Sequence, residues 1–495
     1  MIKLLILPEV LIDAAQKGGD SKALLEKARQ EGFQAWVLAD STQRLVLAGI
    51  ASKKVAETLQ GFAQIPINAR LSEEALALGG NFENQLVKLA AKYFKIDQIV
   101  GLGPERKREE VATLPVQDAL KLTEDPLAKV DFMNLFLQVQ PIFNQVDGWY
   151  MEIINNTAFA GGNHVAAFEE AFATYCGTKY AVGVGSGTDA LRFAMLAAGI
   201  GQGDEVLVPT NTFMATSESV TQCGATPVFV DVLPGTYNMD PKAAEKAITS
   251  KTKALLPVHL YGQPADMDAL LSLAEKKGLL LIEDACQAHG ATYKGKRAGS
   301  MGAAAAFSLY PGKNLGAFGE AGAITTNDPE IARLAKQYRE HGQSKKYYHA
   351  SEGYNGRMDN LQAASVRAKL PLLDGWNQKR RERAQWYFEG LGKVSQVTLP
   401  KEADGAQSVW HLFVILVPEA QKLMDHLATK NISTAYHYPV PLHLQDAYQF
   451  MGLGRGTFPV AENAADHLLS LPLFPELNKA QIERVIAEIK AFFGA

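Results

Sequence analysis

The chain has 495 residues, of which 47% are hydrophobic, and a formal net charge of −4. This length and composition favour a globular protein of about two to four compact units, and the small charge, with no basic block at either end, gives no electrostatic ground for a nucleic-acid or membrane-surface partner. Cys176, Cys223 and Cys286 lack the spacing of zinc sites and disulfide frameworks, so we expect no bound metal, reduced thiols and a cytoplasmic location.

Residues 1–103 alternate short apolar runs such as KLLIL and AWVLA with helical patterns, which predicts a small α/β domain. Pro8, Glu9 and Asp13 interrupt the first apolar run before a signal-peptide core can form. No run in the chain approaches the roughly 18 to 20 apolar residues that span a bilayer. Residues 104–129 are charged and contain three prolines, so we expect an interdomain linker there.

A second unit is predicted to begin at Val130. From there to about residue 330, near-continuous apolar strands alternate with helical segments, which is typical of a mostly parallel sheet covered by helices on both faces. We expect this large domain to occupy residues 130–375 and a smaller α/β lobe to occupy residues 376–495.

The segment GVGSGTDAL, residues 183–191, predicts a strand that turns into a helix through Gly187 and Thr188. Free backbone N–H groups and the helix dipole attract a phosphate at such a turn. On this segment alone, plain helix capping is the more common interpretation.

Two later segments carry titratable groups at strand ends. LLLIEDACQAHG, residues 279–290, places Asp284 at the end of a buried strand, where a carboxylate either meets a cation or caps a helix. FSLYPGKNLGAFGEAGAI, residues 307–324, surrounds Lys313 with glycine and apolar residues, so this lysine is either paired or reactive.

Together the three segments offer a site for an anionic group, a carboxylate partner for a ring, and an amine that can form a Schiff base. Pyridoxal phosphate needs all three. Phe213, in VPTNTFMAT, can supply a flat surface for the ring, although taken singly it is more often a core residue.

Several motifs in fixed order resemble the DegT/DnrJ/StrS-type nucleotide-sugar aminotransferases, a fold-type I pyridoxal-phosphate family. They are GSGTDAL, VPTNTFMAT, PVHLYGQPADMD, IEDACQAHG, FSLYPGKNLGAFGEAGA and GYNGRMDNLQAA. The resemblance runs from about Val130 to the C-terminus. It implies the fold of that family, and it leaves residues 1–129 outside.

The resemblance also implies roles for the cofactor-binding residues. Lys313 matches the Schiff-base lysine, and Asp284 matches the aspartate that faces the pyridine nitrogen. Gln287 matches the side chain near the ring hydroxyl, and Phe213 falls where an aromatic side chain stacks on the ring. The phosphate ligands match Gly187 through its backbone, Thr188 and Ser308.

Other matched residues concern the partner subunit and the substrate. Asn355, in GYNGRMD, matches a residue that reaches the phosphate of the neighbouring subunit's cofactor, which implies a homodimer with shared active sites. Arg357 is expected to face the nucleotide-sugar. His437 and Tyr438, in HYPVPLH, are expected near the sugar.

The resemblance implies transfer of an amino group from an amino acid, with L-glutamate as the family expectation, to a nucleotide-linked keto-sugar. HLYGQPADMD, EDACQAHGA, YPGKNLGA and the REHGQ around His341 look most like the subgroup that aminates position 3 of a dTDP- or UDP-linked 3-keto hexose, in amino-sugar and polysaccharide biosynthesis. A 4-keto acceptor and a non-catalytic regulator on the same fold stay open as alternatives. The sugar dehydratase branch has histidine at the reactive lysine position, and Lys313 argues against it.

The order of elements in residues 1–103 is similar to that of PIN domains, small α/β nucleases that bind divalent metal through acids. Two strand-end positions where acids are expected read LPE and GLG, so the acidic cluster is broken, although Asp13, Asp40 and Glu83 remain. We therefore expect a degenerate domain used for contacts or oligomerisation.

Overall fold

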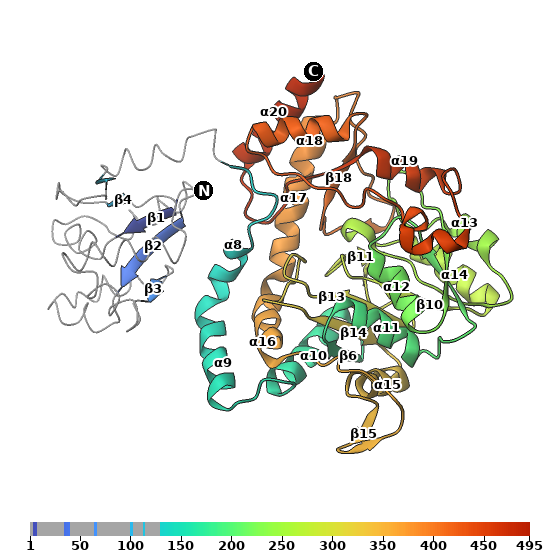
Figure 1. The fold of residues 1–495 in the computed structure, drawn as a ribbon. Helices are drawn as coiled ribbons and strands as arrows, with labels where there is room; N and C mark the ends of the chain where they lie inside the picture. Colours follow the sequence, from blue (N-terminus) through green and yellow to red (C-terminus); the bar gives the residue numbers. More distant parts are fainter. Residues whose placement is uncertain (1–2, 7–33, 40–63, 67–99, 102–111, 114–128) are drawn as a thin grey trace. The chain divides into compact units, whose positions relative to one another are not determined.

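The structure is a computed structural model that describes residues 3–6, 34–39, 64–66, 100–101, 112–113 and 129–495 (Figure 1). The chain divides into two compact units, Met1–Lys129 and Val130–Ala495. The expected linker, the internal boundary at residue 375 and the PIN-like character of the first unit stay predictions, and Asp13, Asp40 and Glu83 lie outside the described residues.

The described part of the first unit consists of short strands. β1 (Lys3–Ile6), β2 (Gln34–Ala39) and β3 (Gln64–Pro66) form a parallel sheet in that order, and β4 (Val100–Gly101) pairs in parallel with β5 (Ala112–Thr113). The strands expected at KLLIL and AWVLA are therefore present, and β5 falls inside the segment expected to be a linker.

The second unit is built on a seven-stranded sheet whose strand order is β6-β14-β13-β10-β9-β7-β8. Every neighbouring pair is parallel except the two that involve β14, which is antiparallel to β13 and to β6. The predicted α/β class with a mostly parallel sheet is confirmed. The strands are β6 (Tyr180–Val184), β7 (Glu205–Pro209), β8 (Thr226–Val230), β9 (Thr252–Leu255), β10 (Leu280–Asp284), β13 (Ala304–Ser308) and β14 (Gly322–Thr326).

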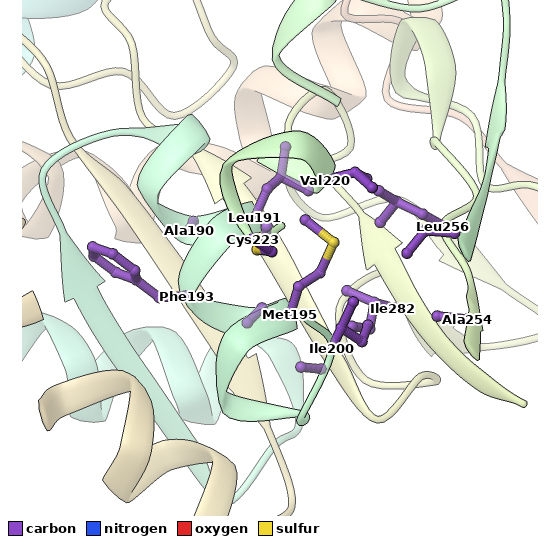
Figure 2. Packing of buried hydrophobic residues seen from close by; sticks show 14 of the residues in the cluster. Ala190, Leu191, Phe193, Met195, Ile200, Val220, Cys223, Ala254, Leu256 and Ile282 are labelled. Atoms are coloured by element: carbon purple, nitrogen blue, oxygen red, sulfur yellow. The ribbon is translucent and has the colours of Figure 1, made fainter. Parts of the chain in front are cut away.

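Helices cover both faces of this sheet because successive strand residues are apolar on both sides. Ile282 of β10 packs with α11 on one face, whereas its neighbour Leu281 packs with α14 on the other. Figure 2 shows the first of these cores, in which Leu191, Met195 and Val220 meet the strand residues. The helices are α10 (Asn163–Cys176), α11 (Gly187–Ala197), α12 (Met214–Gln222), α13 (Pro241–Ala247), α14 (Met267–Lys277), α15 (Pro329–Arg339) and α16 (Asn360–Lys369).

A smaller lobe completes the second unit around its own apolar core. β18 (Phe413–Leu416) and β19 (Leu468–Leu471) pair antiparallel, and α17 (Leu373–Leu391), α18 (Ala420–Thr429) and α20 (Lys479–Phe493) pack with them (Figure 1). The remaining elements are α8 (Leu135–Val139), α9 (Phe143–Asn155), β11 (Thr292–Tyr293), β12 (Lys296–Arg297), β15 (Gln343–Lys345), β16 (Tyr348–His349), β17 (Ala406–Gln407) and α19 (Pro459–His467). No described helix is long and apolar enough to cross a membrane.

Candidate active site

A cavity of about 570 Å³ opens at the carboxyl ends of β6, β7, β10 and β13. This is the edge at which open α/β sheets bind their ligands. Nine of the residues singled out by the sequence line it: Gly187, Thr188, Phe213, Asp284, Gln287, Ser308, Lys313, His437 and Tyr438.

The turn from β6 into α11 forms one end of the cavity. Ser186 caps α11 by accepting a hydrogen bond from the Asp189 N–H at 3.0 Å, so capping and an open helix start coexist at this turn. A Cβ atom on Gly187 would lie 2.6 Å from Cβ of Ser308, at the end of β13. Glycine therefore lets α11 begin this close to β13. The first N–H groups of a helix have no intrahelical partner, so they are available to an anion in the cavity.

Asp284 ends β10 with its side chain buried on the cavity. Its Oδ2 accepts a hydrogen bond from Oγ1 of Thr216 at 2.8 Å, and its Oδ1 accepts one from the Cys286 N–H at 3.2 Å. These two donors fix the orientation of the carboxylate. The carboxylate of Asp284 is therefore oriented so that it can bind a cationic group in the cavity.

Glu283, the neighbouring acid, belongs to the protein interior and not to the cavity. It accepts hydrogen bonds from His259 at 2.9 Å and from the backbone N–H groups of Gly299, Met301 and Gly302 at 2.7–2.8 Å. Burial acts to raise the pKa of Glu283, but these hydrogen bonds outweigh it and hold the pKa below its usual value. Its charge is thus met by structural donors.

Lys313 lies on the cavity between Gly312 and Asn314. Burial lowers the pKa of its amine below the usual value, against the opposing influence of Cys286 and Asp284. A lysine must lose its proton before it can attack a carbonyl carbon, and desolvation is one of the ways in which proteins achieve this. The local environment of Lys313 is therefore that of a reactive amine.

Aromatic side chains form another wall. Phe213 is 55% exposed and its ring centroid lies 5.6 Å from that of Tyr438, so it faces the opening and is not a core residue. The Tyr438 hydroxyl accepts a hydrogen bond from Nε2 of Gln287 at 3.3 Å. Burial raises the pKa of Tyr438 and lowers that of His437 to about 4, so both side chains are neutral near pH 7.

Asn355 and Arg357 do not line this cavity. Arg357 donates to Oε1 of Glu340 at 2.8 Å and to Oδ1 of Asn355 at 2.7 Å. His341 also lies off the cavity, and its carbonyl oxygen is 2.8 Å from Nδ1 of His349.

Sequence reasoning missed several lining residues, including Phe132, Met133, Thr216, Tyr310 and His411. Thr216 and Tyr310 lie within motifs already identified, so their positions were open to inference. Phe132, Met133 and His411 lie outside those motifs, so no local sequence signal points to them.

Residues 146–490 match the model of the DegT/DnrJ/EryC1/StrS aminotransferase family. The chain belongs to this family. The resemblance seen in the sequence is thereby confirmed over most of the second unit, which includes the residues that line the cavity after Met133.

This chain aligns with several known proteins over nearly their whole length. The erythromycin biosynthesis sensory transduction protein EryC1 of Saccharopolyspora erythraea is 45% identical over 362 residues, which are 73% of this chain and 99% of that protein. The dTDP-3-amino-3,4,6-trideoxy-alpha-D-glucose transaminase of Streptomyces venezuelae is 44% identical, over 73% of this chain and 96% of its own. The crystal structure of DesV from S. venezuelae in complex with a ketimine intermediate has 44% identity and a TM-score of 0.73, and covers 74% of this chain and 99% of its own.

Proposed function

We propose that this aminotransferase uses pyridoxal phosphate to move an amino group from an amino acid, with L-glutamate as the expected donor, to position 3 of a dTDP- or UDP-linked 3-keto sugar. The observation that carries the proposal is the placement of Lys313, Asp284 and the start of α11 around one cavity. The name of the 44% identical S. venezuelae transaminase supports a 3-amino product over a 4-amino one.

The residues present fit this cofactor. The helix start at Gly187 and Thr188, together with Ser308, suits its phosphate, because anions bind where backbone N–H groups and the helix dipole converge. The oriented carboxylate of Asp284 suits its ring nitrogen. Phe213 offers a flat face at the cavity opening.

When bound, pyridoxal phosphate supplies an aldehyde that takes up amino groups and a ring that withdraws electrons from the adjoining carbon. Lys313, its pKa lowered by burial, would hold the cofactor, and its Nζ would be the base that takes a proton from the donor's α-carbon. The negative charge of Asp284 would favour the protonated form of the ring nitrogen. The neutral side chains of His437 and Tyr438 line the space left for the acceptor sugar.

A homodimer with shared sites is part of the proposal. Asn355 and Arg357 lie outside the cavity of their own chain, and Arg357 ends near polar partners at the surface. Large apolar side chains are exposed on and near α9, among them Phe143, Met151 and Ile154. Exposed apolar surface of this kind marks protein interfaces. We expect a cytoplasmic enzyme, consistent with its three free cysteines.

The function is tested by adding L-glutamate to the purified protein saturated with pyridoxal phosphate. The visible absorbance of the bound cofactor should bleach in the wild type and not in Lys313→Ala. A dTDP-linked 3-keto sugar should then restore the original spectrum faster than its 4-keto isomer. A wild type that binds the cofactor but never bleaches would favour a regulator, a role that the name of the S. erythraea relative suggests for that protein.

A further inference from the structure

His411 lines the same cavity as Lys313 but belongs to the smaller lobe, two residues before β18. Its side chain is buried, and Nδ1 lies 3.1 Å from Oδ1 of Asn314, the residue that follows Lys313. Because His411 and Lys313 line one cavity, the protonation state of each ring nitrogen decides whether His411 can accept a hydrogen bond there.

A chain of amides fixes which ring nitrogen carries the hydrogen. Nδ2 of Asn377 donates to the carbonyl oxygen of His289 at 2.8 Å, so Oδ1 of Asn377 is free to accept. Nδ2 of Asn314 donates to that oxygen at 2.9 Å and to the carbonyl oxygen of Val409 at 3.1 Å. Oδ1 of Asn314 is therefore an acceptor, and the hydrogen between it and His411 sits on Nδ1. A neutral imidazole protonated at Nδ1 has a lone pair on Nε2.

The ring is neutral at pH 7. Burial holds the pKa of His411 well below its usual value, and the charges of Lys313 and Arg380 act in the same direction. Within the described part of the chain, Nε2 has no hydrogen-bond partner, so its lone pair is open towards the cavity. His411 thus presents an unused hydrogen-bond acceptor to the cavity that Lys313 also lines.

Other titratable groups surround the two residues. Burial, and then the charge of Lys313, lowers the pKa of His289 to about 3 and that of His437 to about 4, so neither ring carries charge at pH 7. The groups that face Lys313 or His411 are Asp284 at the end of β10, Cys286 after that strand, Glu320, His437 and Tyr438 on the cavity, and His289 and Arg380 in the buried surroundings.

We propose that His411 is a positioning residue for Lys313, accepting at Nε2 a hydrogen bond from the Nζ ammonium that Lys313 becomes while it carries the substrate's proton. The proposal rests on the function proposed above. The proton leaves the donor's α-carbon, resides on Nζ and is given up again from Nζ, so no proton is gained or lost by His411. A hydrogen bond to a charged group stabilises that charged form about 10- to 150-fold.

Two variants separate this role from simple packing. His411→Asn places an amide near the position of Nδ1 and keeps the hydrogen bond to Asn314, but it removes the acceptor from the cavity. His411→Gln places an amide oxygen near the position of Nε2 and restores an acceptor. Circular dichroism of both variants establishes that they are folded.

The first readout does not depend on activity. The cofactor-free protein is acetylated with acetic anhydride across a pH series, and modification of Lys313 is quantified by mass spectrometry. Because the ammonium form loses its acceptor, the midpoint in His411→Asn should fall by about one to two pH units, whereas His411→Gln should stay near the wild type. Equal midpoints in all three proteins would overturn the proposal.

The second readout is the half-reaction of the holoenzyme with L-glutamate. His411→Asn should react about 10- to 150-fold more slowly, with a larger isotope effect from α-deuterated glutamate and little change in KM, and His411→Gln should recover most of the rate. Equal losses in both variants would indicate a packing role only. If the wild type itself does not react with glutamate, the proposed function fails, while the acetylation midpoints still decide the role of His411.

Discussion

Gly187→Ala tests whether the start of α11 is the phosphate site. The added Cβ would lie 2.6 Å from Cβ and 3.0 Å from Cα of Ser308, whereas ordinary contacts begin at 3.4 Å. Ser308 ends β13, whose backbone is paired with β10 on one side and β14 on the other, so it has little freedom to retreat. The helix start must shift instead, and overpacking of this kind costs about 1–3 kcal/mol.

We therefore expect Gly187→Ala to unfold at lower urea concentration and to bind pyridoxal phosphate at least about 10-fold more weakly, because the shift moves the N–H groups that receive the phosphate. Binding is measured by fluorescence titration of the cofactor-free protein. Gly375→Ala is the matched control, since Gly375 lies in α17 with nothing within 4 Å of its added Cβ. The reasoning is wrong if Gly187→Ala binds the cofactor as tightly as this control.

Two further variants test the buried charges by the pH dependence of stability. Glu283→Gln should destabilise the protein by about 1–3 kcal/mol at pH 7, because it removes a charged hydrogen-bond acceptor. Since the pKa of Glu283 is lowered in the folded protein, the difference in urea midpoint between the wild type and this variant should shrink as the pH falls below the ordinary pKa of 4.5. A difference that stays constant with pH would contradict this prediction. Lys369 is buried with its Nζ donating to the carbonyl oxygen of Gly316 at 2.7 Å, and burial lowers its pKa from 10.5 to about 8. Between pH 8 and 10.5 the unfolded chain therefore binds more protons than the folded protein. The free energy of unfolding of the wild type should rise relative to that of Lys369→Met by about 3 kcal/mol over this range. Parallel pH profiles for the two proteins would refute the lowered pKa of Lys369.

The sequence located the cofactor-binding side of the site because its parts follow contiguous motifs. Functional residues at the end of a parallel strand lie at the carboxyl edge of the sheet, whatever the position of that strand in the strand order. This holds for small residues that lead into a helix and for an acidic residue at a strand end. Gly187, Asp284 and Lys313 could therefore be placed on one edge before the strand order was known, and the structure has all three on one cavity. The expectation that Phe213 stacks on the cofactor ring rested on the family resemblance and stays a prediction; the structure has this side chain exposed on the cavity.

Taken by itself, the sequence determined the fold class, the family and the residues expected to hold the cofactor, because each follows from local periodicity or from a short motif. Tertiary structure alone decided which distant segments close the cavity: Phe132 before α8, and His411 and His437 in the smaller lobe. It also decided the protonation states, since the low pKa of Lys313 and the Nδ1–H form of His411 arise from burial and from hydrogen bonds between residues far apart in the chain. Local sequence cannot encode these properties, because desolvation and hydrogen-bond direction depend on everything that surrounds a group in the folded protein.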